Sequence, residues 1–163
     1  MRQARTQVVV SAAVLLSGLL TCFSAFPETN IVAGATDAIA GFGSAYAPVF
    51  LEPGASDEAA AVQWDIVFDP DLVTYVGAVA GAAATEAGKS VNAVLYSPGR
   101  VRVAVWGFNT NTMGQGPIAM LAFRAPYYVS PATVPLTVEN VVVSDLYGAA
   151  IASGSPNGAI TIR

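Results

Sequence analysis

The chain has 163 residues, of which 54% are hydrophobic and only 11% are charged, and its formal net charge is −4. This composition supplies a hydrophobic core and excludes a disordered chain, and an acidic chain without clustered lysine and arginine does not suit nucleic-acid binding. With no histidine and a single cysteine at position 22, the remainder of the chain lacks the commonest general base, thiolate ligands and disulfides, so we expect no metal and no cofactor.

Residues 1–25 have the pattern of a signal peptide. Arg2 and Arg5 form a positively charged start, and the apolar run Val8–Leu20 that follows is interrupted only by small residues. That run is too short to span a bilayer comfortably but has the length of the apolar region of a signal peptide. We expect cleavage after residue 24 or 25 and export to the cell surface, the periplasm or the extracellular space.

Two other fates of the N-terminal segment stay open, namely an uncleaved membrane anchor and lipidation of Cys22. The residue before this cysteine is Thr21, which fits a lipoprotein signal poorly. Cleavage would leave residues 26–163 as a single domain with five basic and eleven acidic residues. A domain of this size and acidity is expected to be soluble and to disfavour anionic partners.

The rest of the chain consists of short β-type runs separated by turn residues, and it has no amphipathic helical stretch of useful length. The predicted strands are Ser44–Leu51, Val62–Phe68, Thr74–Val79, Val91–Tyr96, Val101–Trp106, Ile118–Phe123, Val134–Val143 and Ala159–Ile162. Val134–Val143 is either one strand broken near Asn140 or two strands, and Gly77–Gly88 is predicted to be a loop with at most a helical turn. Eight or nine strands in one domain predict an all-β sandwich or jelly roll.

Two of these strands show the alternation of a sheet with one buried face. In Val62–Phe68 every second residue is apolar, which places Trp64 in the core rather than on a binding surface. In Val101–Trp106 the valines alternate with Arg102, and Arg100 precedes them on the same face as Arg102. The strand therefore has one buried and one solvated face, and the Pro-Gly pair before it predicts a hairpin turn.

Several segments also share an order and spacing with a known family. They are the turn Phe68–Val73, the hairpin and strand Pro98–Ala104, the strand Gly116–Arg124, and the closing strands within Pro135–Asp145 and Asn157–Ile162. Together, over about residues 31–163, they resemble the cohesin domains of cellulosomes and related carbohydrate-module sandwiches. The resemblance implies a nine-stranded jelly-roll sandwich that holds a dockerin domain borne by another protein.

In cohesins the dockerin packs on a flat sheet face formed by the strand before the Asp-Pro turn and by the hairpin strands. By position, the resemblance implies a partner-binding face that consists of Ala61, Gln63, Asp65, Val67, Arg100, Arg102, Ala104 and Trp106. The best-studied cohesins carry Asn and Asp where this chain has Ala61 and Gln63, so the resemblance does not imply the same dockerins. Taken singly, each residue is also explained as a solvated surface residue, with Asp65 and Arg102 as a cross-strand pair.

The carboxylates give little support to an enzyme. The pairs that could serve in glycoside hydrolysis are Asp57 with Glu58, Asp69 with Asp71, and Glu139 with Asp145. Asp69 and Asp71 flank Pro70 in a turn, where acidic residues are common for backbone reasons. No calcium-binding loop of the EF-hand type occurs, so we expect neither a calcium site of this kind nor a dockerin. We expect a non-catalytic binding protein.

Two alternatives to a dockerin-binding module stay open. A carbohydrate-binding module shares the architecture, but it needs coplanar exposed aromatic residues, and one of the two tryptophans is predicted to be core. A surface or matrix protein that has lost dockerin binding is the second.

Tyr127 and Tyr128 lie between prolines and are predicted to be a packed loop cover. For a module of the cohesin type, we expect a link to polysaccharide degradation or to cell-surface assembly.

Overall fold

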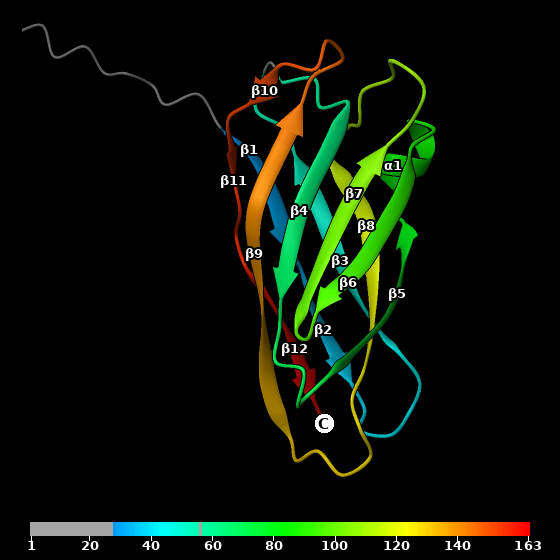
Figure 1. The fold of residues 1–163 in the computed structure, drawn as a ribbon, viewed down its shortest axis with the longest axis vertical. Coiled ribbons are helices and arrows are strands. Elements are labelled where there is room, and N and C mark those ends of the chain that lie inside the picture. Colours follow the sequence, from blue (N-terminus) through cyan, green and yellow to red (C-terminus); the bar gives the residue numbers. More distant parts are fainter. Residues whose placement is uncertain (1–27, 56) are drawn as a thin grey trace, which may run out of the picture.

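The computed structural model describes residues 28–55 and 57–163, which form two β-sheets packed face to face (Figure 1). One sheet has the strand order β11 (Ser153–Gly154), β1 (Thr29–Ala33), β3 (Ala45–Glu52), β8 (Gly116–Arg124) and β5 (Thr74–Ala80). The other has the order β2 (Ala35–Ala38), β12 (Gly158–Ile162), β9 (Ala132–Ser144), β4 (Ala61–Val67), β7 (Arg100–Trp106) and β6 (Ser90–Ser97), with β10 (Ala150–Ile151) paired to β9. We call them the rear and the front sheet, after their places in Figure 1.

The predicted all-β sandwich is confirmed. Of the twelve strands in the described residues, β2, β10 and β11 have four residues or fewer, which leaves the nine longer strands that the resemblance implies. The eight strands predicted from the sequence correspond to β3–β9 and β12. The strands that the sequence did not predict are β1, β2, β10 and β11. Three of these have four residues or fewer, which is too short for a pattern of alternation to be recognised, and β1 begins with the polar but buried Thr29.

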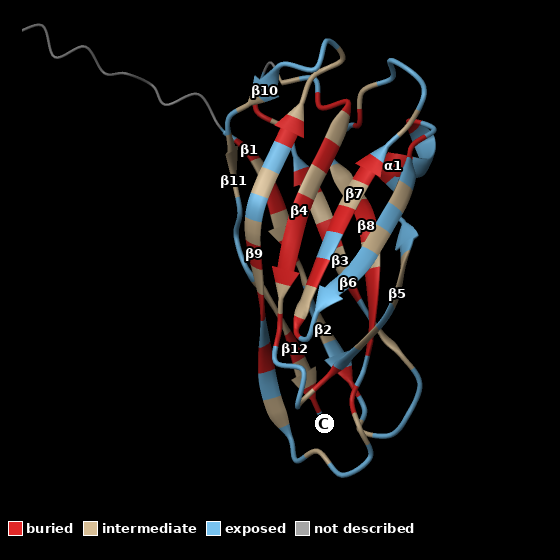
Figure 2. Cartoon of the chain, in the orientation of Figure 1, coloured by how far each residue is buried: buried red, intermediate tan, exposed pale blue. Residues whose placement is uncertain are grey.

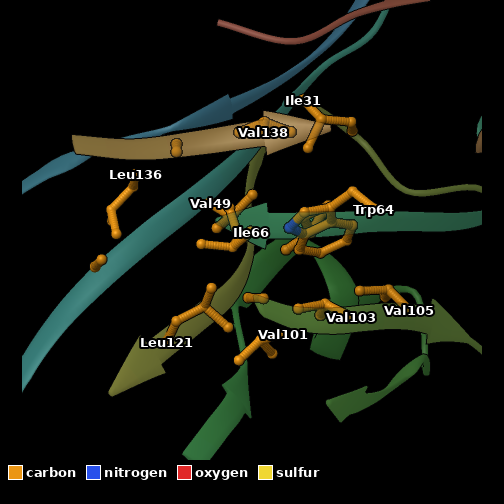
Figure 3. Close-up of a cluster of buried hydrophobic side chains, with 14 of the residues drawn as sticks. Ile31, Val49, Trp64, Ile66, Val101, Val103, Val105, Leu121, Leu136 and Val138 are labelled. Atoms are coloured by element: carbon orange, nitrogen blue, oxygen red, sulfur yellow. The ribbon is translucent and has the colours of Figure 1, made fainter. Parts of the chain in front are cut away.

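The core lies between the sheets and contains the alternating residues predicted to be buried. Trp64 is completely buried, and the valines of β7 pack around it with residues of both sheets (Figure 3). In Figure 2 the buried positions run along β4 and alternate with partly exposed ones along β7. The front sheet is thus dry on its inner side and available to solvent or a partner on its outer side.

Strand β9 resolves the alternative that the sequence left open, because it is one continuous strand of thirteen residues with an irregularity at Asn140. This residue has φ of 52°, in the left-handed region that asparagine tolerates better than most residues. Opposite it, the register between β9 and β4 shifts between Gln63 and Asp65. The irregularity is a β-bulge, which redirects the side chain of Asn140.

The turn between β6 and β7 is built from Pro98 and Gly99, as the sequence predicts. Gly99 has φ of 72°, and its carbonyl accepts a hydrogen bond from the backbone N–H of Phe68 at 2.9 Å. The hairpin is thereby fixed to the end of β4. A Cβ at position 99 would lie 2.6 Å from the Phe68 carbonyl oxygen, so only glycine fits this close approach.

The region Gly77–Gly88 contains the helical turn that the sequence allows, but the loop itself is shorter than predicted. Strand β5 continues to Ala80, and the helix α1 (Ala82–Glu86) follows it. The helix is short because the glycines on either side limit its length, and it buries Ala83 and Ala84 against the core. Among the described residues, no helix has the length and apolar character needed to cross a membrane.

Candidate partner-binding face

The residues predicted to form the partner-binding face come together on the outer side of β4 and β7. Cross-strand pairing places Gln63 opposite Ala104, Asp65 opposite Arg102, and Val67 opposite Arg100. Strand β6 extends the face with Asn92, Val94 and Tyr96, and β9 adds Glu139, Asn140 and Val142. The face therefore spans four neighbouring strands.

Asp65 differs from the prediction of a solvated surface residue, because its side chain is completely buried. Arg102 binds both carboxylate oxygens, with Nε at 2.8 Å from Oδ1 and Nη2 at 3.0 Å from Oδ2. The Tyr96 hydroxyl and the Asn140 amide also donate to Oδ2, at 3.0 and 2.8 Å. The predicted cross-strand pair with Arg102 is thus present, as the centre of a larger network that covers the carboxylate.

The network lowers the pKa of Asp65 from 3.8 to about 2. The hydrogen bonds from Arg102 are the largest cause, those from Asn140 and Tyr96 act in the same direction, and burial of the carboxyl opposes them. Asp65 is therefore an anion at neutral pH, and its acceptor capacity is used by its neighbours. It positions the arginines of the face and is not available to a ligand.

The two arginines are held in place by further contacts. Arg100 forms an ion pair with Glu139 at 2.7 Å and lies 3.7 Å from Asp65. The guanidinium of Arg102 lies over the ring of Tyr96, 5.1 Å from its centroid.

Sequence reasoning identified neither Tyr96 nor Asn140 as a member of the face. For Asn140, the break in the β9 pattern was a signal of an irregular backbone, although not of its contact with Asp65.

The half of the face formed by the start of β4 and the end of β7 carries no charge, and two hollows lie over it, one of which extends into the ionic half as far as Arg102. One shallow hollow of about 220 Å³ is bordered by Ala61, Gln63, Ala104, Trp106 and Val142. A second hollow of about 340 Å³ begins at Gln63 and Ala104 and extends towards Tyr96 and Arg102. The small side chains of Ala61 and Ala104 form the floor between larger neighbours, so a partner's side chains could enter there.

An aromatic pair borders the uncharged half of the face. Trp106 is 41% exposed, and Phe108, which sequence reasoning missed, is 99% exposed. Their rings meet edge to face, with centroids 5.0 Å apart and planes at 82°. Exposed aromatic residues of this kind are frequent anchors of protein interfaces, whereas perpendicular rings do not form a flat platform for stacking on a sugar.

The loop that carries Phe108 is fastened to the segment after α1. The Asn109 and Asn111 side-chain amides donate to the carbonyls of Gly88 and Ala87 at 3.0 and 3.2 Å. Lys89 donates from Nζ to the Asn109 carbonyl at 3.1 Å, and burial lowers the pKa of this lysine. These bonds restrict the loop, so less conformational entropy remains to be lost when a partner binds.

Among the candidate carboxylates, Asp69, Asp145 and Glu139 have structural contacts. Asp69 accepts a bond from the Asp71 backbone N–H at 2.9 Å, which is a turn-forming interaction. Asp145 accepts bonds from two backbone N–H groups of its own loop, and Glu139 is paired with Arg100. In residues 28–55 and 57–163, no three His, Cys, Asp or Glu side chains form a group that could hold a metal ion.

The expectation that Tyr127 and Tyr128 form a packed loop cover is wrong. Their exposed fractions are 78% and 88%. The ring of Tyr127 lies beside Gly41, where an added Cβ would lie 2.4 Å from it. Flanking prolines indicate a loop, but they do not determine whether its side chains point inward or outward.

No family model and no curated protein matches the sequence, whereas solved structures match over most of the chain. The sixth cohesin of Acetivibrio cellulolyticus scaffoldin B, in complex with the Cel5 dockerin, has a TM-score of 0.72 and 17% identity, over 84% of this chain and all of that one. A non-cellulosomal cohesin from the archaeon Archaeoglobus fulgidus has a TM-score of 0.68 and 17% identity, over 84% of this chain and 92% of its own. The cohesin module of a Clostridium perfringens family 33 glycoside hydrolase has a TM-score of 0.71 and 13% identity, over 83% and 97%. The fold that the sequence resemblance implies is thus confirmed, and the chain has the fold of a cohesin module.

Proposed function

We propose that the chain is a non-catalytic protein-binding module of the cohesin type, and that a dockerin-like domain of another protein docks on the outer side of β4, β6 and β7. The observation that carries this proposal is the division of the face into a fixed ionic half and an uncharged half, with hollows over the uncharged half that extend as far as Arg102. In the ionic half, Asp65, Arg100 and Arg102 are already paired. Polar side chains that are held in position before binding, next to an exposed apolar anchor residue, are typical of specific protein interfaces.

The hollows also indicate how this face would select a partner. Ala61 and Ala104 leave space beside Gln63 and Trp106, so the partner must supply side chains that fill it. The best-studied cohesins carry Asn and Asp at the positions of Ala61 and Gln63. Since the Ala61 side chain offers a partner no hydrogen bond, the dockerin proposed here fills this space with apolar groups. Two solved structures with the same fold are complexes with dockerins of Clostridium thermocellum and support this type of partner.

We further propose that the module acts outside the cytoplasm, in polysaccharide degradation or in assembly at the cell surface. Support comes from the signal-peptide pattern of residues 1–25, which lie outside the described residues. On this view the working protein is the single domain of residues 26–163. Retention of the N-terminal segment as an anchor, or lipidation of Cys22, would instead keep it on a membrane.

Calorimetric titration with each dockerin domain encoded in the same genome tests the proposal. We expect at least one to bind with a dissociation constant in the micromolar range or below, as specific interfaces of standard size do. A genome without dockerins, or dockerins that produce no heat, would favour the surface or matrix protein that has lost this binding. A pull-down on insoluble polysaccharides tests the carbohydrate-binding alternative, and we expect no retention there.

A further inference from the structure

The outer side of the rear sheet carries an apolar surface that the proposed partner does not use. Cross-strand register places Val32 beside Phe50 and Pro48 beside Met120, and Met120 is in turn beside Val79. Residues on this side include Val32, Tyr46, Pro48, Phe50, Met120, Gly77, Val79 and the nearly buried Ala122, and none of these eight is charged. Tyr46 and Val79 are 51% and 54% exposed. We call these eight residues the rear patch.

The rear patch is bounded by one acidic and one basic residue at opposite ends of the strands. Glu52 ends β3 and Arg124 ends β8, and both are exposed. Neither forms an ion pair within residues 28–55 and 57–163. Glu52 lies four residues beyond Pro48, and Arg124 lies four residues beyond Met120 in the opposite direction, because β3 and β8 are antiparallel. The two charges are thus about equally far, roughly 14 Å along the strands, from the Pro48–Met120 pair.

We infer that a second copy of this chain packs on the rear patch, related by a two-fold axis. The axis lies between the two rear sheets and runs across the strands at the level of Pro48 and Met120. This rotation reverses the strand direction, so the Glu52 of each copy comes to the end of the sheet where Arg124 of the other lies. Both long side chains can reach across the gap of about 10 Å between packed sheets.

The charge distribution favours a second copy over an unrelated partner. Because the chain is acidic, two copies repel each other over most of their surfaces. The rear patch is a broad surface without charged residues, so two copies do not repel each other there. Glu52 and Arg124 at its ends are complementary to the same surface after a two-fold rotation. An isologous interface between two copies requires this self-complementarity, whereas an interface with an unrelated protein does not.

The size of the rear patch limits the strength of the dimer. Four strands spaced about 4.8 Å apart, with five to nine residues each, cover roughly 20 by 24 Å, so the dimer buries on the order of 1,000 Å² in total. This area is at the lower limit for a specific interface, and micromolar association is expected. The front face stays free, so the dimer would present two partner-binding faces on its opposite sides (Figure 1).

Sedimentation equilibrium tests the inference on the soluble protein obtained by expressing the full chain, from about 1 to 500 μM. We expect a reversible monomer–dimer equilibrium. Met120→Lys in the rear patch should weaken the dimer at least tenfold. The matched control is Val142→Lys on the front sheet, which adds the same charge at an exposed strand residue and should leave the dimer unchanged.

Charge reversal tests the proposed axis. Glu52→Arg or Arg124→Glu alone replaces two attractive contacts by two repulsive ones and should weaken the dimer about tenfold. The double variant should restore it to within about threefold of the original chain. Both residues are exposed, so unchanged melting temperatures will show that folding is intact. A chain that stays monomeric throughout, equal effects of the Met120 and Val142 variants, or a double variant that restores nothing would each overturn the inference.

Discussion

Arg102 binds both oxygens of Asp65 across the β4–β7 pair, and this carboxylate is completely buried although it belongs to the outer side of the sheet. Arg102 itself stays half exposed, with 47% of its side chain accessible. The same pair therefore contributes to the stability of the domain and to the surface that we propose for partner binding. A change at either residue affects both properties, and they have to be measured separately.

Arg102→Met should lower the free energy of unfolding by about 2 kcal/mol, because it leaves a buried carboxylate with fewer donors. The remaining donors, Tyr96 and Asn140, limit the loss. Urea unfolding followed by tryptophan fluorescence measures the change. The double variant Asp65→Asn/Arg102→Met should be less destabilised than the sum of the two single variants. A strictly additive result would contradict a direct interaction between the two residues.

Stability should fall with acid in a window set by Asp65. Its pKa is about 2 in the folded protein and 3.8 in an ordinary environment, so the stabilisation is present above about pH 4 and is lost as the pH falls towards 2. The difference corresponds to about 2 kcal/mol. The free energy of unfolding, measured between pH 2 and 6, should decline less steeply in Asp65→Asn. An equal decline in both proteins would mean that other carboxyl groups cause it.

Asn140 contributes through both its backbone and its side chain, and two variants separate these contributions. Asn140→Gly removes the hydrogen bond to Asp65 but retains the backbone at φ of 52°, whereas Asn140→Ala also strains that backbone. We expect glycine to destabilise the protein by about 1 kcal/mol and alanine by about 1 kcal/mol more. In both variants the pKa of Asp65, followed by NMR, should rise. If it does not rise, the amide does not stabilise the carboxylate.

Gly99→Ala should be among the most destabilising single-methyl additions. Its Cβ would lie 2.6 Å from the Phe68 carbonyl oxygen, in a residue with φ of 72°. We expect a loss of more than about 2 kcal/mol. The matched control is Gly43→Ala, where φ is 58° but no atom lies within 4 Å, and it should lose only about 1 kcal/mol. Thermal unfolding compares the two, and equal losses would refute the close approach.

The sequence predicted the strands well where the residues themselves carry the alternation. Val101, Val103 and Val105 are completely buried, as expected, because a period of two has only one arrangement that hides three valines. Strands such as β10 and β11 have two residues each and carry no such pattern. Their positions depend on contacts with distant strands, which a local pattern does not contain.

The candidate face was predicted in position but not in chemistry. Alternation correctly placed Gln63 and Arg102 on the outer side of the front sheet, yet it also predicted a solvated Asp65. That carboxylate is covered because Tyr96 and Asn140 reach it from two other strands, 31 and 75 residues away in the sequence. Contacts over such separations follow from the sheet order and the bulge in β9, which the sequence pattern alone does not determine.

The most direct test of the proposed function is a calorimetric titration of a binding dockerin with variants of the two hollows on the front face. Ala104→Arg fills the floor of both hollows without touching the core and should weaken binding at least tenfold, since it blocks the space for the partner's side chains. Thr133→Arg, at an exposed residue near the other end of β9, adds the same charge and should leave the affinity unchanged. Equal affinities for the original chain and Ala104→Arg would contradict docking on this face.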